Sequence, residues 1–460
     1  MNKHLPKVAS LSALLLVGGS ANAIEYTLTT GFSTERTNNV GRVSDDSGLV
    51  QKDWIHRPTL RGIIDHQGNN LQLTGDYLVE HRIYTEDVFD DRTRWTGRAD
   101  LRWDALPELL QFNVTNSRTE TLEDSLIQDV ETNRQVTSVT SAGPKLAFRP
   151  RTSDELSLEY RYSDISQGQV NTGATIDPNV PQLDSDSERQ LFTIAYELGL
   201  TENRSITAAV SRDKVDFNQN APELEIDTAS LQYESKGDAL ELILRGGYTT
   251  IDRTLGRDKV DGVIGRLNLM WRVSGSGQFD VTASRNINDQ SDDVLRGSAA
   301  FGQGAVFENT DVNEVFEEHM LRVGYTHRWG RNTATLSYRL QNQDFEDSAF
   351  IDAQSRDEEE SGFTLFLARR LTPRIEARFS GSIIERDFED RGVIEDYLTA
   401  DFRIDWQVGR SLRLFAGANY EERDARGDSP LVDQLTFDEF VYLFGFNFDL
   451  INRSKLPQKR

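Results

Sequence analysis

The arginines and carboxylates are the side chains of this sequence whose types and spacing could do chemistry, because they recur at every second position of many segments. Arg98 and Arg102 flank Asp100, for example. A guanidinium group presents a planar fork of N–H donors that suits carboxylates, phosphates and hydroxyl groups. The pattern predicts a polar surface with two open interpretations. In the first, this surface attracts anionic or hydroxyl-rich solutes. In the second, its charges neutralise one another as Arg–carboxylate pairs between neighbouring strands.

These side chains fall on one face of the segments in which they occur, opposite a row of apolar residues. The candidate lumen-lining residues are Arg57, Arg61, Arg98, Arg102, Arg161, Arg266, Arg322, Arg339, Arg378, Arg403, Arg413, Asp65, Asp100, Glu159, Asp401 and Asp405. An arginine facing hydrocarbon costs about 2–4 kcal/mol near the membrane midplane. If the segments cross a membrane, this face must therefore line a lumen.

Catalytic chemistry finds no support in the sequence. The 6 histidines show no metal-ligand spacing, and none lies beside a serine in a nucleophile context. The glycine-rich stretch Phe301–Gly304 lacks the Gly-Lys-Ser/Thr that must follow in a phosphate-binding loop. The chain contains no cysteine, which excludes thiol chemistry and disulfides. We therefore expect no catalytic residues, no metal site, no cofactor and no enzyme activity.

The elements that must carry the polar face are illustrated by the stretch from Arg94 to Val114. Trp95, Leu101 and Trp103 lie at every second position, with charged residues between them. A period of two indicates a strand whose two faces meet different solvents. At about 3.3 Å per residue and a tilt of about 40°, the two tryptophans are separated by roughly 20 Å along a membrane normal. This is the pattern of a membrane-spanning hairpin.

The same alternation repeats along the chain in segments of about ten to fourteen residues, with no sustained helical period. Short turns and longer polar connections alternate without a break, as in an up-and-down barrel with tight periplasmic turns and long extracellular loops. No segment after the N-terminal region approaches the ~18 apolar residues of a spanning helix. We predict an all-β fold, a transmembrane antiparallel β-barrel of about twenty strands, with eighteen as the alternative.

The tryptophans give an independent test of this fold. Four of them precede short turns, and two lie where strands descend from long loops. The predicted membrane-interface girdle comprises Trp54, Trp95, Trp103, Trp271, Trp329 and Trp406. In the alternative, a soluble β-sandwich, each would be a core aromatic.

The N-terminus has the features of a secretory signal peptide. A short basic region with Lys3 and Lys7 is followed by an apolar run and by the small residues Ala21-Asn22-Ala23. We expect a signal peptide at 1–23, a barrel at 24–450, and a short basic periplasmic tail at 451–460, in the outer membrane of a Gram-negative bacterium. Lipid and lipopolysaccharide are then partners. The net charge of -24 argues against a nucleic-acid partner.

Several short motifs add a resemblance. Asn133-Arg134-Gln135 leads to Gly143-Pro144-Lys145 and an Arg149-Pro150 turn, and strands end in Arg-Asp at 212–213, 386–387 and 423–424. On these motifs the chain resembles the proteobacterial outer-membrane β-barrel porins associated with exopolysaccharide biosynthesis, the EpsL-like and PEP-CTERM-system-associated groups. The resemblance implies a pore through which a secreted polysaccharide leaves the cell, with periplasmic export machinery as a partner. It brings no catalytic residues.

The sequence thus predicts an outer-membrane channel that takes part in exopolysaccharide export. Two other functions stay open. The barrel could be a general or anion-preferring diffusion porin, or a structural or adhesive barrel that does not conduct.

Overall fold

A computed structural model describes residues 24–44, 47–122, 134–168, 186–217, 223–254, 259–289, 315–345, 357–389, 392–427 and 432–453. These residues form a single sheet of strands and one short helix. The predicted signal peptide at 1–23 lies outside the described residues. The last strand runs to Arg453, so the predicted tail begins in strand conformation, and 454–460 lie outside the described residues.

Alternation of side chains between two solvents makes each segment a strand of 13 to 18 residues. The strands are β1 Glu25–Thr37, β2 Asp53–Gln67, β3 Leu71–Tyr84, β4 Arg92–Leu106, β5 Leu110–Leu122, β6 Arg134–Arg151, β7 Asp154–Gly168, β8 Ser187–Thr201, β9 Arg204–Phe217, β10 Leu224–Lys236, β11 Leu240–Arg253, β12 Val260–Arg272, β13 Gly277–Asp289, β14 Val315–Trp329, β15 Asn332–Phe345, β16 Glu358–Thr372, β17 Ile375–Phe388, β18 Val393–Gln407, β19 Leu412–Gly427 and β20 Phe437–Arg453.

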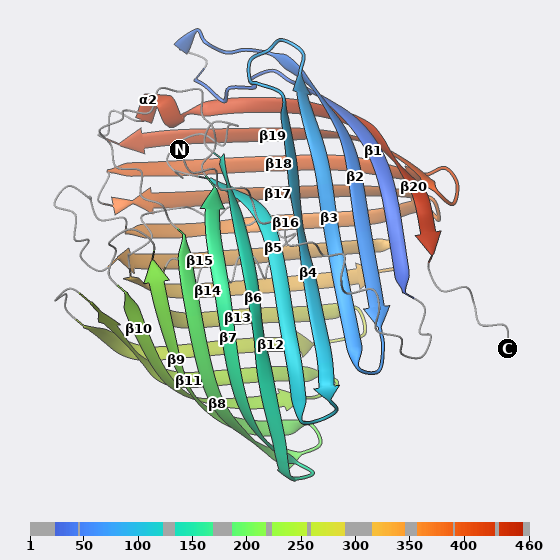
Figure 1. The fold of residues 1–460 in the computed structure, drawn as a ribbon. Coiled ribbons are helices and arrows are strands. Elements are labelled where there is room, and N and C mark those ends of the chain that lie inside the picture. The colour runs from blue at the N-terminus through green and yellow to red at the C-terminus, as the bar shows by residue number, and fades with distance from the viewer. Residues whose placement is uncertain are drawn as a thin grey trace, which may run out of the picture.

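Each strand pairs antiparallel with its neighbours in the sequence, and β1 pairs with β20 to close the ring (Figure 1). Thr29 of β1 donates a hydrogen bond to Asp449 of β20 at 2.9 Å across this closure. The 20-stranded sheet confirms the predicted up-and-down barrel and selects twenty strands over eighteen.

One end of the barrel carries only tight turns, at the positions that the sequence predicted. The turn between β14 and β15 is formed by Gly330 and Arg331, and Gly330 has a φ of 57°, which glycine adopts without strain. The other end carries the longer connections. The helix α2, Val432–Leu435, lies in one of them, between β19 and β20.

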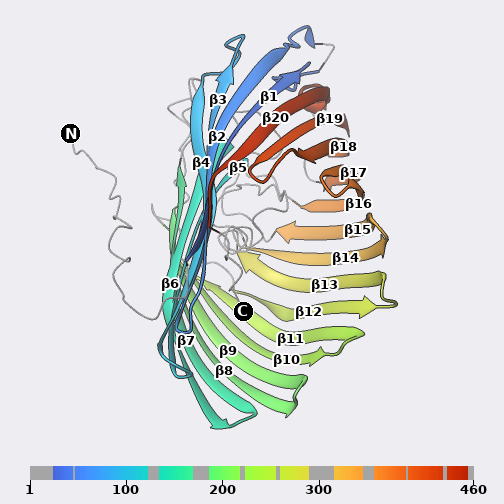
Figure 2. The ribbon, with the colours of Figure 1, turned by 90° about the vertical axis from the view of Figure 1, so that its right-hand side faces the viewer.

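The strands form two facing walls that cross at a steep angle, which follows from their tilt. In Figure 1 the strands β2 to β7 run down the front wall, and β16 to β19 run across the back wall. Figure 2, turned by 90°, shows the same two walls from the side.

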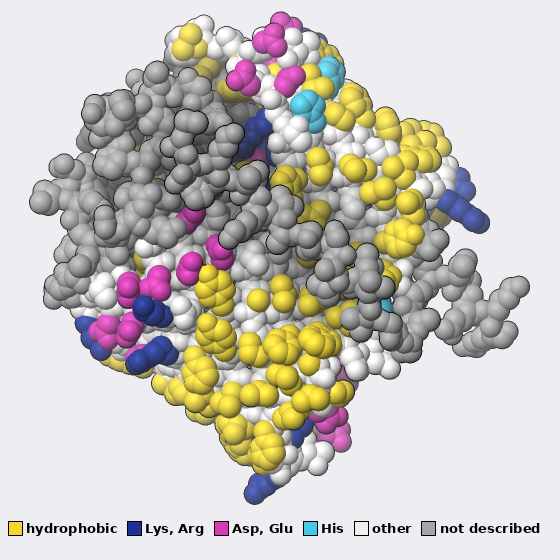
Figure 3. Space-filling view, viewed as in Figure 1, with side chains coloured by type: hydrophobic (Ala, Val, Ile, Leu, Met, Phe, Trp, Pro, Cys, Tyr) yellow, Lys and Arg dark blue, Asp and Glu magenta, His cyan; other side chains and the backbone are white. Residues whose placement is uncertain are grey.

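The outward face of the sheet is apolar. Leu158, Leu244 and Val263 are exposed there, and Figure 3 shows hydrophobic side chains spread over the front wall. All 6 tryptophans lie on this face with 37% to 48% of their surface exposed. A closed barrel with an apolar exterior is the β-architecture that hydrocarbon tolerates. The protein is an outer-membrane β-barrel.

The tryptophans fall near strand ends, as the girdle prediction requires. Trp271, Trp329 and Trp406 lie in the last two residues of their strands, and Trp54 is the second residue of β2. Their role at the membrane interface stays a prediction. Among the described residues, no helix is long and apolar enough to cross a membrane.

Candidate functional site in the barrel lumen

The strand register divides the residues between the two faces of the wall. Trp95 and Trp103 are exposed on the outer face of β4, so Arg98, Asp100 and Arg102 at the intervening parity point inward. Following the paired positions around the ring places all the candidate lumen-lining residues on this inner face. Their part in conduction stays a prediction.

Most of the candidate arginines are paired with carboxylates. Arg98 donates two hydrogen bonds to Asp100, at 2.7 and 2.8 Å. Arg61 forms a two-bond pair with Asp76, and its Nε–Oδ1 distance is 2.7 Å. Such forked pairs fix both partners and offset their charges.

The same pairing continues on other strands. Asp405 accepts hydrogen bonds from both Arg378 and Arg403. Arg161 pairs with Glu159 on the same strand. The remaining candidate pairs are Arg57–Glu35 at 2.5 Å, Arg102–Asp104 at 3.2 Å and Arg339–Glu360 at 3.2 Å. Several of these pairs lie within one strand, two residues apart, which the expectation of pairs between strands did not include.

Three candidate arginines differ from the rest. Arg266 contacts the amide of Asn268, and Arg413 donates to Gln407. Within the described part of the chain, Arg322 has no carboxylate partner, and it faces Arg339 directly across the β14–β15 pair. Asp65 accepts a hydrogen bond from Gln67 at 2.8 Å. Among the described residues, Arg322 is therefore a lumen charge that no carboxylate offsets directly.

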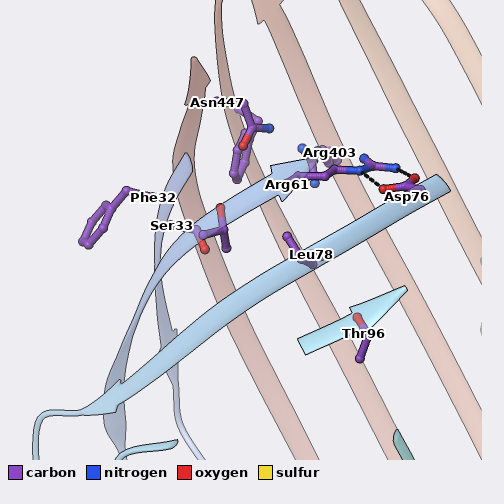
Figure 4. Close-up of a pocket in the computed structure, with 10 residues that line it drawn as sticks. Phe32, Ser33, Arg61, Asp76, Leu78, Thr96, Arg403 and Asn447 are labelled. Carbon is purple, nitrogen blue, oxygen red and sulfur yellow. Dashed lines mark hydrogen bonds and ion pairs between the residues drawn. The ribbon is translucent and has the colours of Figure 1, made fainter. Parts of the chain in front are cut away.

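A cavity of about 360 Å³ lies in the inner wall where β1 to β4 meet β18 to β20, and we call it the lumen pocket. In Figure 4 dashed lines join Arg61 to Asp76, Arg403 overlaps this pair in the view, and Asn447 lies apart from it. The lining also includes Ser33, Thr59, Leu78, Thr96 and Phe415, and Phe32, whose ring points away from the other labelled side chains.

Glycines make room for the aromatic ring of this pocket. A Cβ atom at Gly445 would lie 2.4 Å from the ring of Phe415, so only glycine lets that ring lie across β20. A Cβ at Gly31 would likewise lie 2.4 Å from Oδ1 of Asn447. The guanidinium of Arg403 stacks over Phe415 at 4.1 Å from the ring centre.

The lumen pocket offers hydrogen-bond donors, acceptors and an apolar face together. Asn447 supplies both a donor and an acceptor, Asp76 supplies acceptors, and Phe415 supplies an aromatic surface. Because the charges of Arg61 and Asp76 offset each other, the pocket has no strong preference for a small ion. It suits a polyhydroxylated ring, which has hydroxyls at its edge and C–H groups on its faces.

A second cavity of about 290 Å³, the outer pocket, lies nearer the long loops on the same wall. Arg57 and Glu35 form an ion pair in its lining, and Arg42 contacts Glu439 at 2.9 Å. The candidate residue Asp401 also lines this cavity. Arg57 and Arg61 lie four residues apart on one strand, so the two pockets follow one another along the wall.

Sequence reasoning missed several of these residues. Phe415 was detectable, because it is an aromatic residue at an inward position between the outward Leu414 and Ala416. Asp76 lies at an inward position of its strand, as Leu78 does, so its direction could be read from the same alternation. Asn447 gave none, because its importance depends on Gly31 of a strand more than four hundred residues away. No cluster of histidines and carboxylates in the described residues could hold a metal ion.

Comparison with known proteins finds no matching family model and no matching curated protein. Among solved structures, the chain is similar to the FrpB iron transporter (F3-3 variant) of Neisseria meningitidis, with 9% identity, a TM-score of 0.49, and coverage of 92% of this chain and 81% of that one. It is also similar to the siderophore receptor PirA of Pseudomonas aeruginosa, with 11% identity, a TM-score of 0.45, and coverage of 92% and 80%. It is similar as well to OccK2 of Pseudomonas aeruginosa, with 11% identity, a TM-score of 0.41, and coverage of 93% of this chain and 98% of that one.

Proposed function

We propose that the barrel is an outer-membrane channel for hydroxyl-rich solutes, and that a secreted exopolysaccharide is the glycan it carries. The observation that carries this proposal is the lumen pocket, where Phe415, Asn447 and the offset pair Arg61–Asp76 present a polar and an aromatic surface to the lumen. The resemblance to exopolysaccharide-associated barrels points to the same solute class.

The charge pattern favours a glycan over a small ion on this wall. Arg61 and Arg403 each have a carboxylate partner, so a passing anion meets little net charge there. Sugar hydroxyls instead exchange hydrogen bonds with both members of a pair. The outer pocket continues this lining toward the long loops.

A second function, an anion-preferring diffusion channel, is favoured by the opposite wall. Arg322 and Arg339 are direct cross-strand partners, and Glu360 pairs with Arg339 but not with Arg322, so the charge of Arg322 is left to attract an anion. This arrangement predicts anion selectivity whether or not a glycan also passes.

Single-channel conductance of the refolded mature chain, with and without oligosaccharides, tests both functions. Glycan export predicts steady conductance that neutral oligosaccharides of increasing length block, and loss of surface polysaccharide when the gene is deleted. Anion diffusion predicts selectivity under a salt gradient, no block by oligosaccharides, and normal polysaccharide in the deletion strain. A folded barrel with no conductance in the presence of periplasmic extract would overturn both and indicate a structural or adhesive role.

A further inference from the structure

The pairing between β12 and β13 is shorter than the strands themselves. The register ends at the pair Gly265–Arg285, although β12 begins at Val260 and β13 continues to Asp289. Beyond that pair, β12 stays paired with β11, and β13 stays paired with β14. The described wall is therefore discontinuous along this line in its extracellular part.

The end of β13 lies on the lumen side of its neighbours. Arg285 belongs to the outward row of β13, and the unbroken alternation gives Ile287 and Asp289 the same direction. Both are nevertheless buried, and Ile287 packs against Leu224 and Ile251, which point inward from β10 and β11. The ends of β13 and β14 therefore overlap the inner surface of β9 to β12. We call this overlap the lap seam.

The space between the two layers of the lap seam is apolar. The seam cluster that fills it comprises Val215, Leu224, Ile251, Ile287 and Val315. A Cβ atom at Gly262 of β12 would lie 2.8 Å from Cδ1 of Ile287, so glycine lets that side chain lie against the backbone of β12. The lap seam is thus a buried apolar cluster beside a break in the strand ladder.

Charged side chains hold the end of β13 in the lap seam. Arg189 of β8 contacts Asp289 at 3.1 Å, and its Nε lies 3.1 Å from Oδ2 of Asp213 on β9. All three side chains are largely buried. The pair fastens the end of β13 to the opposite layer without any backbone hydrogen bond to β12 in the described register.

The outer end of the lap seam meets the apolar exterior of the barrel. Val263 of β12 and its cross-strand partner Tyr248 are 58% and 48% exposed on the outward face. Val263 lies two residues before Gly265, in the part of β12 that is not paired with β13. Two apolar environments, the seam cluster and the membrane-facing surface, are therefore separated by a break in the strand ladder. Strand separation there costs no backbone hydrogen bonds of the β12–β13 ladder.

We propose that the lap seam is a lateral passage that admits the acyl chain of a lipid from the outer leaflet. An acyl chain lying between the layers replaces the contacts among the aliphatic side chains of the seam cluster, so apolar surface stays out of water. The polar head group then lies toward the Arg189 end, where the charged side chains of Arg189, Asp213 and Asp289 lie. This inference does not depend on conduction along the barrel axis.

Photolabelling of the full mature chain in vesicles that contain a diazirine-bearing phospholipid tests the proposal. Lateral entry predicts labels on Val215, Leu224 or Ile251, which point inward and cannot meet bulk lipid through an intact wall. Val139 and Ile165 are an internal control, because they form a second inward-facing buried cluster on the continuous β6–β7 pair. They should remain unlabelled.

A disulfide across the lap seam provides a second test of the proposal. The double variant Gly262→Cys with Ile287→Cys should lose labelling of the seam cluster when oxidised and regain it on reduction, and the chain has no cysteine of its own to interfere. The matched control, Val139→Cys with Ile165→Cys, joins direct cross-strand partners and should leave labelling unchanged. Labels on the exposed Val263 with none on the seam cluster would overturn the proposal, as would equal labelling of the control cluster.

Discussion

The lumen pocket and the lap seam both lie on the inner surface of the barrel, but their side chains are of opposite kinds. The lumen pocket is lined by an ion pair and an amide around an aromatic ring, and the side chains of Arg61 and Asp76 are 51% and 37% exposed. The lap seam is filled by aliphatic side chains, and its ion pair at Arg189 is almost fully buried. The first region keeps its polar groups available to a solute, whereas the second excludes water.

This difference separates two uses of the same side-chain types. An exposed ion pair contributes about 0–1 kcal/mol to stability, so the pair at Arg61 is free to serve recognition. A buried pair has a large desolvation cost, and breaking it is expensive because a charge is left without its partner. Arg189 at the lap seam therefore stabilises the fold and holds the end of β13 in place, whereas Arg61 at the lumen pocket serves solute binding.

Removal of the buried arginine should have the largest effect. Arg189→Ala leaves the buried carboxylates of Asp213 and Asp289 without their shared guanidinium, and we expect the free energy of unfolding to fall by about 3–5 kcal/mol. Urea unfolding in vesicles, followed by tryptophan fluorescence, measures it. The comparison variant Arg61→Ala should lose no more than about 1 kcal/mol. Equal losses would contradict the distinction between the two regions.

Truncation in the seam cluster should come next. Leu224→Ala removes a fully buried side chain and leaves a cavity, so we expect a loss of about 2–5 kcal/mol in the free energy of unfolding. Block by oligosaccharides should not change. Leu78→Ala, in the half-buried lining of the lumen pocket, is the control and should lose less. A larger loss from the lumen-pocket variant would show that the two regions are packed alike.

The ring of the lumen pocket should govern glycan binding. Phe415→Ala removes the aromatic surface, and we expect the affinity for a blocking oligosaccharide to fall about tenfold, which is about 1.4 kcal/mol. Current fluctuations in single channels measure this affinity. Phe402→Ala, on the outward face of β18, should leave the affinity unchanged. Unchanged block in Phe415→Ala would move the glycan path to another part of the wall.

The smallest expected effect is on ion selectivity. Arg322→Gln removes a lumen arginine that has no carboxylate partner among the described residues, so the reversal potential under a salt gradient should move toward the non-selective value. Arg369→Gln, on the outward face of β16, is the control and should not move it. A reversal potential that is the same in both variants would remove the support for anion preference.

The fold could be predicted from the sequence because one feature, the alternation of apolar and polar residues with a period of two, determines every strand. Alternation about Trp95 and Trp103 is local information, and the turns and loops separate the strands one by one. The inward direction of the candidate arginines follows from the same parity. The lap seam could not be predicted, because Ile287 and Asp289 keep the alternation of outward residues and are buried only by the overlap of layers. The lumen pocket was also hidden, since Asn447 and Gly31 meet only when the ring closes.

The closure between β1 and β20 has a consequence for how the chain folds. Thr29 and Asp449, which share a hydrogen bond, are separated by 420 residues. Contacts of such sequence separation form late and slowly, because the entropy of a long loop must be overcome before they stabilise anything. Until they form, every intermediate is an open sheet with two unsatisfied edges, which invites aggregation. A chain truncated before Phe437 would therefore not be a smaller barrel but an unclosed sheet in need of protection.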